Sequence, residues 1–387
     1  MKQLQKIPLS SIFMRMSDRN PRPPRPGTAR RLLAIALCVA CTGVAVGCAI
    51  AQEKREIQAE KQLVSLALRP LVIPPAVSGQ GWGVCYGPFR DGQGPDTTAQ
   101  PTKEQIREDL HIIAKHWRMV RMYGQGELTR WTAEIIREDK LPLKLLAGIW
   151  IAPEVQLNDK SEIVSRDESL VAKNRQQVAD GIKLANDFPD VVMALGVGNE
   201  TQVAWSSYRT TAEVLLGYIK QVRASVSQPV TTCDDYNFWN KPESVKIAQQ
   251  CDFIALHAYA MWNKQQLPDA LPWTREQIQV VKNLHPDRSI VLTELGWATQ
   301  KGTEGYQAIG IVAEAGERQQ ELFYRALEHW ATDANQPYFY FSAFDEKWKG
   351  GGATNEVEKN WGVFNSDRTP KLVMQEDHKQ PIPAKAK

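Results

Sequence analysis

Short apolar runs recur between residues 81 and 346 and alternate with stretches whose apolar positions are three or four residues apart. The runs are rich in β-branched and aromatic residues, which is typical of buried strands. The spaced positions indicate helices that bury one face. Eight strands are expected: Trp82–Tyr86, Met119–Tyr123, Leu143–Ile151, Val191–Glu200, Pro229–Asp235, Asp252–Tyr259, Ser289–Trp297 and Tyr338–Glu346. Helical faces are expected over residues 106–117, 128–135, 171–185, 215–226, 278–284 and 322–330, with only the short segment 242–250 after the fifth strand.

Two of these helices carry a start signal. Thr102 is followed three residues later by Gln105, and Thr274 by Gln277. A Thr and a Gln at this spacing form a capping box, in which each side chain bonds the other residue's backbone N–H. The pattern predicts helix starts just after Thr102 and just after Thr274.

Strands that alternate with helices indicate a parallel sheet with right-handed crossovers. Eight such units within residues 80–373 fit a closed (β/α)8 TIM barrel, whose usual length is about 250 residues. The rival is an open, doubly wound sheet, but no Gly-rich phosphate turn follows the first strand. Gly87-Pro88 leads into a long loop instead. We therefore predict one barrel domain over residues 80–373, a linker over 52–79 and a solvated, charged tail over 374–387.

The N-terminal segment has a different composition. Arg30 and Arg31 precede an apolar run over residues 32–51. Basic residues before an apolar run are typical of an export signal. Three outcomes stay open: cleavage after Ala49-Ile50-Ala51, retention as a membrane anchor of about 20 residues, or a lipid on Cys48. Residues 1–51 are thus expected to export the chain to the periplasm or the extracellular space, with attachment to the membrane as an option.

Charge and cysteine content narrow the classes of partner. Residues 1–51 carry eight Lys/Arg and one Asp, or +7, so the rest of a chain of net charge +3 is −4. A mildly acidic body without a long basic run argues against nucleic acid as a partner. Beyond the export segment remain Cys85, Cys233 and Cys251, an odd number without the spacing of a metal site. We expect all three in the core and the protein to be a monomer.

In a parallel barrel the site lies at the C-terminal ends of the strands. The residues expected there are rich in carboxylates, aromatic rings and hydrogen-bonding groups: Tyr86, Arg121, Tyr123, Trp150, Asn199, Glu200, Asp234, Asp235, His257, Tyr259, Glu294, Trp297, Asp345 and Glu346. His257 stands alone, so neither a metal nor another cofactor is expected, and His257 is interpreted as a hydrogen-bonded wall residue. Aromatic faces with carboxylates suit a polyhydroxylated ligand such as a sugar.

Two carboxylates stand out because each ends a strand of similar design. Glu200 ends the fourth strand and Glu294 the seventh, so they face each other across the mouth. Two carboxyl groups about 5–5.5 Å apart can cleave a glycosidic bond with retention, one as nucleophile and the other as acid. The acid must hold its proton near neutral pH, which requires burial or a neighbouring charge to raise its pKa. For a lone strand-end Glu the alternative is a salt bridge or a helix cap.

Six motifs then resemble glycoside hydrolase family 17, the β-1,3-glucanases and glucanosyltransferases. They lie in order over residues 81–371: Gly83-Val84-Cys85-Tyr86-Gly87, Val120-Arg121-Met122-Tyr123, Gly196-Val197-Gly198-Asn199-Glu200, Thr293-Glu294-Leu295-Gly296-Trp297, Phe344-Asp345-Glu346-Lys347-Trp348-Lys349 and Glu358-Lys359-Asn360-Trp361-Gly362-Val363-Phe364. Two positions depart from the family pattern. Leu295 stands where a Thr is more usual, and His257-Ala258-Tyr259 where two aromatics flanking a Pro are common. The loop Pro88–Gly94 is more similar to the bacterial branch than to the plant one.

The resemblance implies a retaining enzyme with Glu200 as acid/base and Glu294 as nucleophile. It also implies that Asn199 holds the sugar 2-hydroxyl and that Glu346, Lys349 and Glu358 form a supporting polar cluster. The expected substrate-binding residues are Tyr86, Arg121, Tyr123, Asn199, Tyr259, Trp297, Glu346, Lys349 and Glu358. The expected partner is a β-glucan oligo- or polysaccharide, either hydrolysed or transferred. The alternatives are a barrel glycosidase for another β-linked glucan or mannan, and a non-catalytic carbohydrate-binding barrel.

Overall fold

The computed structural model describes residues 67–375, apart from 76, 78, 159 and 161. These residues belong to one compact unit, Leu66–Lys387. The expected export segment, residues 32–51, lies outside the described residues, as do most of the expected linker and tail. Within the described part of the chain, no helix combines the length and the apolar character needed to cross a membrane.

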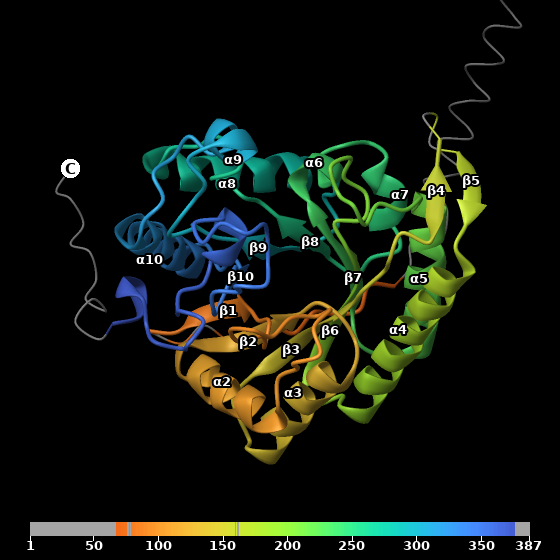
Figure 1. Cartoon of the computed structure of the whole chain (residues 1–387). Helices are drawn as coiled ribbons and strands as arrows, with labels where there is room; N and C mark the ends of the chain where they lie inside the picture. Colours follow the sequence, from red (N-terminus) through yellow and green to blue (C-terminus); the bar gives the residue numbers. More distant parts are fainter. Residues whose placement is uncertain (1–66, 76, 78, 159, 161, 376–387) are drawn as a thin grey trace, which may run out of the picture. The chain divides into compact units, whose positions relative to one another are not determined.

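Eight parallel strands close into a barrel in the order β1-β10-β9-β8-β7-β6-β3-β2 (Figure 1). All eight predicted strands are confirmed, with bounds β1 Gly81–Cys85, β2 Trp117–Met122, β3 Lys144–Ile149, β6 Val192–Asn199, β7 Val230–Asp235, β8 Ile254–His257, β9 Ile290–Leu295 and β10 Tyr338–Tyr340. Nearly all residues of these strands are buried, so side chains fill the space inside the ring of strands. The predicted (β/α)8 barrel is therefore confirmed, and the open sheet is excluded.

The register of the parallel strands brings their polar ends together. Asn199 lies opposite Cys233, Asp235 opposite His257 and His257 opposite Glu294. Because parallel strands present their carboxyl ends at one edge, residues distant in the sequence become neighbours at the mouth of the barrel.

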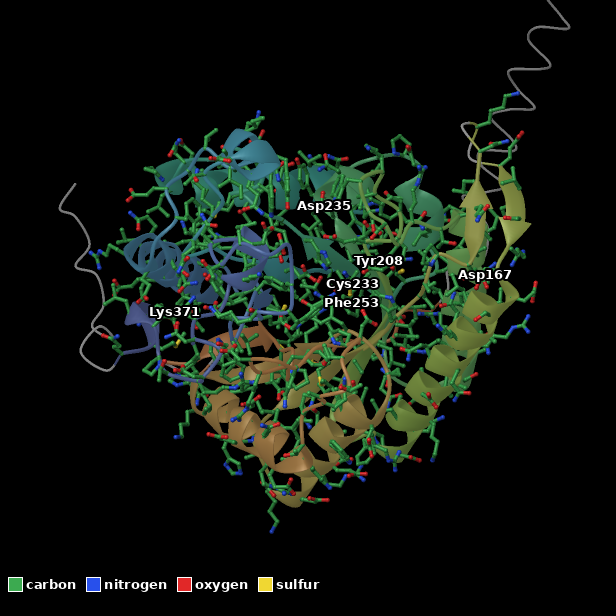
Figure 2. All side chains as sticks on the ribbon, in the orientation of Figure 1. Asp167, Tyr208, Cys233, Asp235, Phe253 and Lys371 are labelled. Carbon is green, nitrogen blue, oxygen red and sulfur yellow. The ribbon has the colours of Figure 1, made fainter. Side chains whose placement is uncertain are left out.

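Helices cover the outside of the barrel (Figure 1). Their bounds are α2 Lys103–His116, α3 Glu127–Glu138, α4 Glu168–Asp187, α5 Ala212–Ser225, α6 Tyr236–Trp239, α7 Ser244–Ala248, α8 Leu267–Leu284, α9 Gly305–Gly310 and α10 Glu317–Asp333, with single 3₁₀ turns η1 Val357–Lys359 and η2 Leu372–Met374. Asp167, labelled in Figure 2, caps α4 by accepting from the N–H groups of Ser169 and Leu170.

One of the two predicted capping boxes is present. Thr102 and Gln105 exchange both bonds at the start of α2. The prediction for Thr274 is wrong, because α8 starts seven residues earlier, at Leu267, with Pro268 in its first turn. Proline fits that position, where its missing N–H would have no helical partner. Thr274 lies in mid-helix, buried, and its hydroxyl donates to the carbonyl of Ala270 at 2.9 Å.

Two features were not predicted from the apolar pattern. A short antiparallel hairpin, β4 Val155–Leu157 with β5 Ile163–Arg166, projects between β3 and α4. The described end of the expected linker packs on the barrel. Arg69 donates from its backbone N–H to Asp252 at 2.8 Å. Leu71 and Ile73 pack against the core and line a small cavity with Met193 of β6 and Val291 of β9. The segment therefore covers the end of the barrel opposite the strand tips.

Candidate active site

Glu294 projects from β9 into a cage of donors at the mouth of the barrel. The apolar residues Ile290–Leu292 before it are buried and fix the strand in the barrel wall. Arg121 Nη1 donates to Glu294 Oε1 at 2.6 Å, and the hydroxyl of Tyr259 donates to Oε2 at 2.7 Å. The side chain is only 7% exposed. Glu294 is therefore a buried carboxylate with both oxygens held.

The donors decide the charge of Glu294. Burial alone would raise the pKa of this carboxyl, but the positive charges of His257 and Arg121 and the bonds from Tyr259 and Arg121 outweigh it and lower the pKa to about 2. Opposite charges and hydrogen bonds to the ionised form act in the same direction. Glu294 is thus an anion throughout the neutral range, as a nucleophilic carboxylate must be.

Glu200 follows β6 directly and has a different setting. Its φ of +50° lies in the left-handed region, which is uncommon for a residue with a side chain. The backbone N–H of Glu200 bonds the carbonyl of Cys233 on β7 at 2.9 Å, which helps to hold this conformation. The carboxyl is 26% exposed, and its Oε1 lies 3.0 Å from His257 Nδ1. Strained backbone of this kind often marks functional residues.

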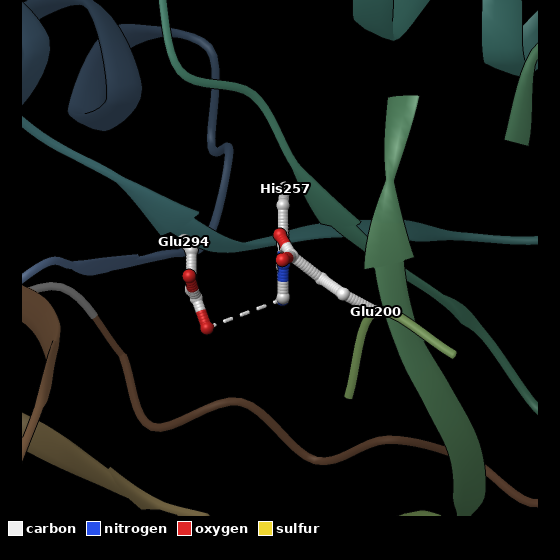
Figure 3. A group of neighbouring side chains, drawn as sticks. All are labelled: Glu200, His257 and Glu294. Carbon is white, nitrogen blue, oxygen red and sulfur yellow. Dashed lines mark hydrogen bonds and ion pairs between the residues drawn. The ribbon is translucent and has the colours of Figure 1, made fainter. Parts of the chain in front are cut away.

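His257 lies between the two carboxyl groups (Figure 3). His257 Nδ1 bonds Glu200. His257 Nε2 lies 3.5 Å from Glu294 Oε1, which is an ion-pair distance. Nε2 has no hydrogen-bond partner among the described residues. Burial disfavours the imidazolium, but the charge of Glu294 and the bonds to Cys233 and Glu200 outweigh burial and raise the pKa of His257 to about 10. The expectation that His257 is a hydrogen-bonded wall residue is confirmed; it also links the two candidate catalytic groups.

The same three residues raise the question of a metal ion. Glu200, His257 and Glu294 each offer a ligand atom, and these atoms lie within 4.8 Å of one another. His257 is the one histidine of this group, and the other two candidate ligands are carboxylates. Yet Arg121 and Tyr259 already bond the oxygens of Glu294, and a guanidinium at 2.6 Å repels a cation. The donor set fits an ion-pair network better than a metal centre.

Asp234 and Asp235 complete the acidic wall beside Glu200. Asp234 accepts from the backbone N–H groups of Gln202 and Asp235, each at 2.9 Å. Burial and the charge of Glu200 raise the pKa of Asp234 to about 8; for Asp235, burial is the largest cause, and its pKa rises to about 7. The sequence placed both at a strand end without a role. Both are buried close to the carboxyl group of Glu200 because of the register between β6 and β7. The apolar pattern of the sequence does not predict that register.

Arg121, Asn199 and Tyr123 form the floor between the carboxylates. Arg121 Nη2 donates to Asn199 Oδ1 at 2.5 Å, and its guanidinium lies 4.5 Å from the centre of the Tyr123 ring. The hydroxyl of Tyr123 is buried, and within the described part of the chain the thiol of Cys85, a weak partner, is the group that interacts with it. A buried polar group without a strong partner is unfavourable, so it suits a ligand hydroxyl.

Lys349 is the centre of a polar cluster that interacts with Glu294. Its Nζ lies 2.6 Å from Glu346 Oε2, and the carboxylates of Glu346, Glu358 and Glu294 raise its pKa against burial. Burial and the charges of Glu200 and Glu294 raise the pKa of Glu358 to about 7, although Lys349 opposes them. Lys349 and Glu358 thus interact electrostatically with the carboxylate pair, and Glu346 pairs with Lys349.

Two predicted substrate-binding residues belong to the core instead. Tyr86 is buried, and its hydroxyl donates to Asp109 at 2.9 Å. Trp297 has an exposure of 0%, lies against Phe323, and donates from Nε1 to the carbonyl of Glu314 at 3.0 Å. Neither ring offers a face to a ligand, because both rings are buried. The sequence-based prediction failed because the side chain of a residue just beyond a strand end can still turn into the barrel wall.

The barrel and the paired carboxylates at its mouth define a class. Two carboxyl groups, with oxygens within 4.8 Å, are the pair with which most glycoside hydrolases cleave a glycosidic bond. The chain belongs to the BtgE/BtgC glycoside hydrolase domain family, whose model matches residues 83–362.

Known proteins agree with this assignment. The chain is 26% identical over 329 residues to a "Glucan 1,3-beta-glucosidase" of Arthroderma benhamiae, covering 80% of this chain and 95% of that protein. It is 25% identical to a "Probable beta-glucosidase btgE" of Aspergillus flavus, but spans only 44% of that longer protein. The crystal structure of an endo-laminarinase from Formosa Hel1_33_131 has the same fold, with a TM-score of 0.67, 24% identity, and coverage of 77% of this chain and 87% of that chain.

Proposed function

We propose that this protein is a retaining glycosidase that acts on β-1,3-glucan through a covalent glucosyl-enzyme intermediate. The observation that carries the proposal is the asymmetric carboxylate pair: one buried and ionised, the other more exposed, with oxygens within 4.8 Å. That distance is in line with the spacing of about 5–5.5 Å in retaining enzymes and is shorter than the spacing of about 6.5–9.5 Å in inverting enzymes. The names of relatives such as the A. benhamiae glucan 1,3-β-glucosidase support the linkage.

In the first step, an oxygen of Glu294 attacks the anomeric carbon of the glucosyl unit. The glycosidic C–O bond breaks as Glu200 gives its proton to the departing oxygen. Arg121 and Tyr259 orient the nucleophile before the attack. We propose that Asn199, whose Oδ1 accepts a hydrogen bond from Arg121, binds the sugar 2-hydroxyl.

In the second step, Glu200 is the base. It takes a proton from water or from a sugar hydroxyl, whose oxygen attacks the anomeric carbon and releases Glu294. Water gives hydrolysis and a sugar hydroxyl gives transfer, with the same residues in the same roles. Two inversions at the anomeric carbon leave the product in the β configuration.

Analysis of the products from β-1,3-linked glucose oligosaccharides tests the proposal. Shorter products with β configuration are expected for hydrolysis, and products longer than the substrate for transfer. A first-formed α product would contradict retention. Turnover of β-1,4-linked glucan or mannan alone would contradict the linkage, and binding of the oligosaccharide without turnover would identify a carbohydrate-binding barrel.

The remaining proposals concern the setting of the enzyme. We propose that residues 1–51 export the barrel to the periplasm or beyond, where residues 32–51 could attach it to the membrane, and that the barrel is a monomer. We further propose membership in the bacterial branch of family 17, supported by the loop Pro88–Gly94. Fractionation of cells that express the full chain, with light scattering of the purified barrel, tests location and oligomeric state. Recovery in the cytoplasm or as a dimer would contradict these proposals.

A further inference from the structure

A pair of aromatic rings beside the mouth has no part in the chemistry above. Trp262 lies in the connection after β8, and Tyr306 is the second residue of α9, after β9. Their rings are parallel, with an interplanar angle of 1° and a centroid distance of 6.0 Å. Tyr306 is 66% exposed, and Ile309 and Val312 nearby in the chain are also exposed. Trp262 and Tyr306 are called the aromatic platform below.

The platform is joined to the carboxylate pair through Tyr259. Asn263, next to Trp262, donates from its backbone N–H and from Nδ2 to the carbonyl of Tyr259, at 3.2 and 2.8 Å. The hydroxyl of Tyr259 in turn donates to Glu294. Since both connections follow the C-terminal ends of their strands, the platform lies at the same end of the barrel as the nucleophile.

Tyr306 is fixed from the other side. The buried side chain of Gln307 accepts from the N–H groups of Gly302 and Val357, at 2.8 and 3.1 Å, and so ties α9 to η1. Its amide donates to the hydroxyl of Tyr306, which donates to Glu356 at 3.2 Å. The turn η1 also carries Glu358, which is electrostatically coupled to Glu200 and Glu294.

The rings are held in place before any ligand binds. A Cβ at Gly310, the last residue of α9, would come within 3.3 Å of the Trp262 ring, so the helix packs tightly on it. A rigid aromatic surface binds at a smaller entropic loss than one that must be ordered first. Core packing does not explain the arrangement, because two-thirds of Tyr306 is open to solvent.

We propose that the aromatic platform is a distal subsite that binds a glucosyl unit of the same glucan chain as the active site. The C–H faces of a pyranose ring are apolar and stack on aromatic rings, while its hydroxyls stay in contact with water and with Glu356. The occupant is assigned by continuity: the platform is connected to the nucleophile through Tyr259 and to the polar cluster through η1. This inference rests on the proposed function, since it assumes a glucan chain in the mouth.

The experiment compares substrates of different length in the variant Tyr306→Ala. The ratio kcat/KM is measured for β-1,3-linked oligosaccharides of two to seven units and for an activated aryl β-glucoside. Loss of one stacked ring is expected to lower kcat/KM for the longer oligosaccharides by about two- to tenfold, in line with aromatic contacts of about 0.5–1.5 kcal/mol. The aryl glucoside, which does not reach the platform, is expected to react as before.

Two matched variants make the result specific. Tyr306→Phe keeps the ring and should retain the length dependence, whereas Val280→Ala removes an exposed apolar side chain from α8 and should change nothing. An equal loss on all substrates, or no loss at any length, would overturn the platform. If the unmodified protein turned over no β-1,3-linked oligosaccharide, the proposed function would be wrong. The platform would still be tested by calorimetric binding of β-1,3- and β-1,4-linked hexasaccharides to the unmodified protein and to Tyr306→Ala. An unchanged affinity of Tyr306→Ala for both hexasaccharides would contradict the platform.

Discussion

Glu200 and Glu294 are the same residue type at the ends of strands in one barrel, yet their surroundings differ. Glu294 is 7% exposed and receives bonds from Arg121 and Tyr259, whereas Glu200 is 26% exposed and bonds His257 from a left-handed backbone. Arg121 and Tyr259 donate to Glu294, whereas the buried acids Asp234 and Asp235 interact with Glu200. Distinct environments of this kind are what assign two carboxylates to separate roles in one site.

Replacement of Glu294, the proposed nucleophile, should have the largest effect. Glu294→Ala is expected to reduce turnover of β-1,3-glucan by several orders of magnitude, because no covalent intermediate can form. Azide should restore cleavage of an activated aryl β-glucoside and give the α-glucosyl azide, since the anion attacks in place of Glu294. Glu200→Ala is the matched control, from which azide should give the β-glucosyl azide. Exchange of these two configurations would reverse the two assignments.

Removal of the acid should discriminate between leaving groups. Glu200→Gln is expected to slow cleavage of unactivated oligosaccharides by about 10²–10⁴-fold, the usual contribution of general acid catalysis. An activated aryl glucoside needs no proton on its leaving oxygen, so its glycosylation step should change far less. Burst kinetics with the aryl glucoside separate this step from the later release. Equal losses with both substrates would argue against an acid role for Glu200.

The sequence predicted the barrel and the carboxylate pair because both follow from local patterns. A buried strand such as Ile290–Leu295 is visible as an apolar run, and the polar residue at its end falls at the mouth once the strands are counted. The position of His257 between two carboxylates depends on register across β6 to β9, which no local pattern encodes. Trp297 shows the same limit, because the ring turns toward α10 and not toward the mouth.

Loss of one donor should weaken the nucleophile without removing it. Tyr259→Phe deletes the bond to Glu294 Oε2 and keeps the ring. A hydrogen bond to a charged group contributes about 1.5–3 kcal/mol, so kcat/KM should fall by roughly ten- to a hundredfold. The pKa of Glu294 should rise, and the acidic limb of the pH profile should move to higher pH. Tyr236→Phe, which removes a hydroxyl bonded to Asn263 instead, is the control. An unchanged acidic limb would show that Tyr259 does not act on the charge of Glu294.

The smallest effect concerns folding stability, where the two carboxylates should again differ. The pKa of Glu294 is about 2 in the folded protein, below the value of about 4.3 expected when unfolded. Its ionisation therefore stabilises the fold above about pH 4.3, and this contribution, on the order of 2–3 kcal/mol, is lost as the pH falls toward 2.

Denaturant unfolding between pH 3 and 7 should show Glu294→Gln less stable than the unmodified protein at pH 7. The gap, which is the difference in free energy of unfolding, should close as the pH falls. Glu200→Gln, at a site nearly four times as exposed, should show a smaller gap at pH 7. Gaps of equal size would contradict a larger contribution from the ionisation of Glu294 to the stability of the fold.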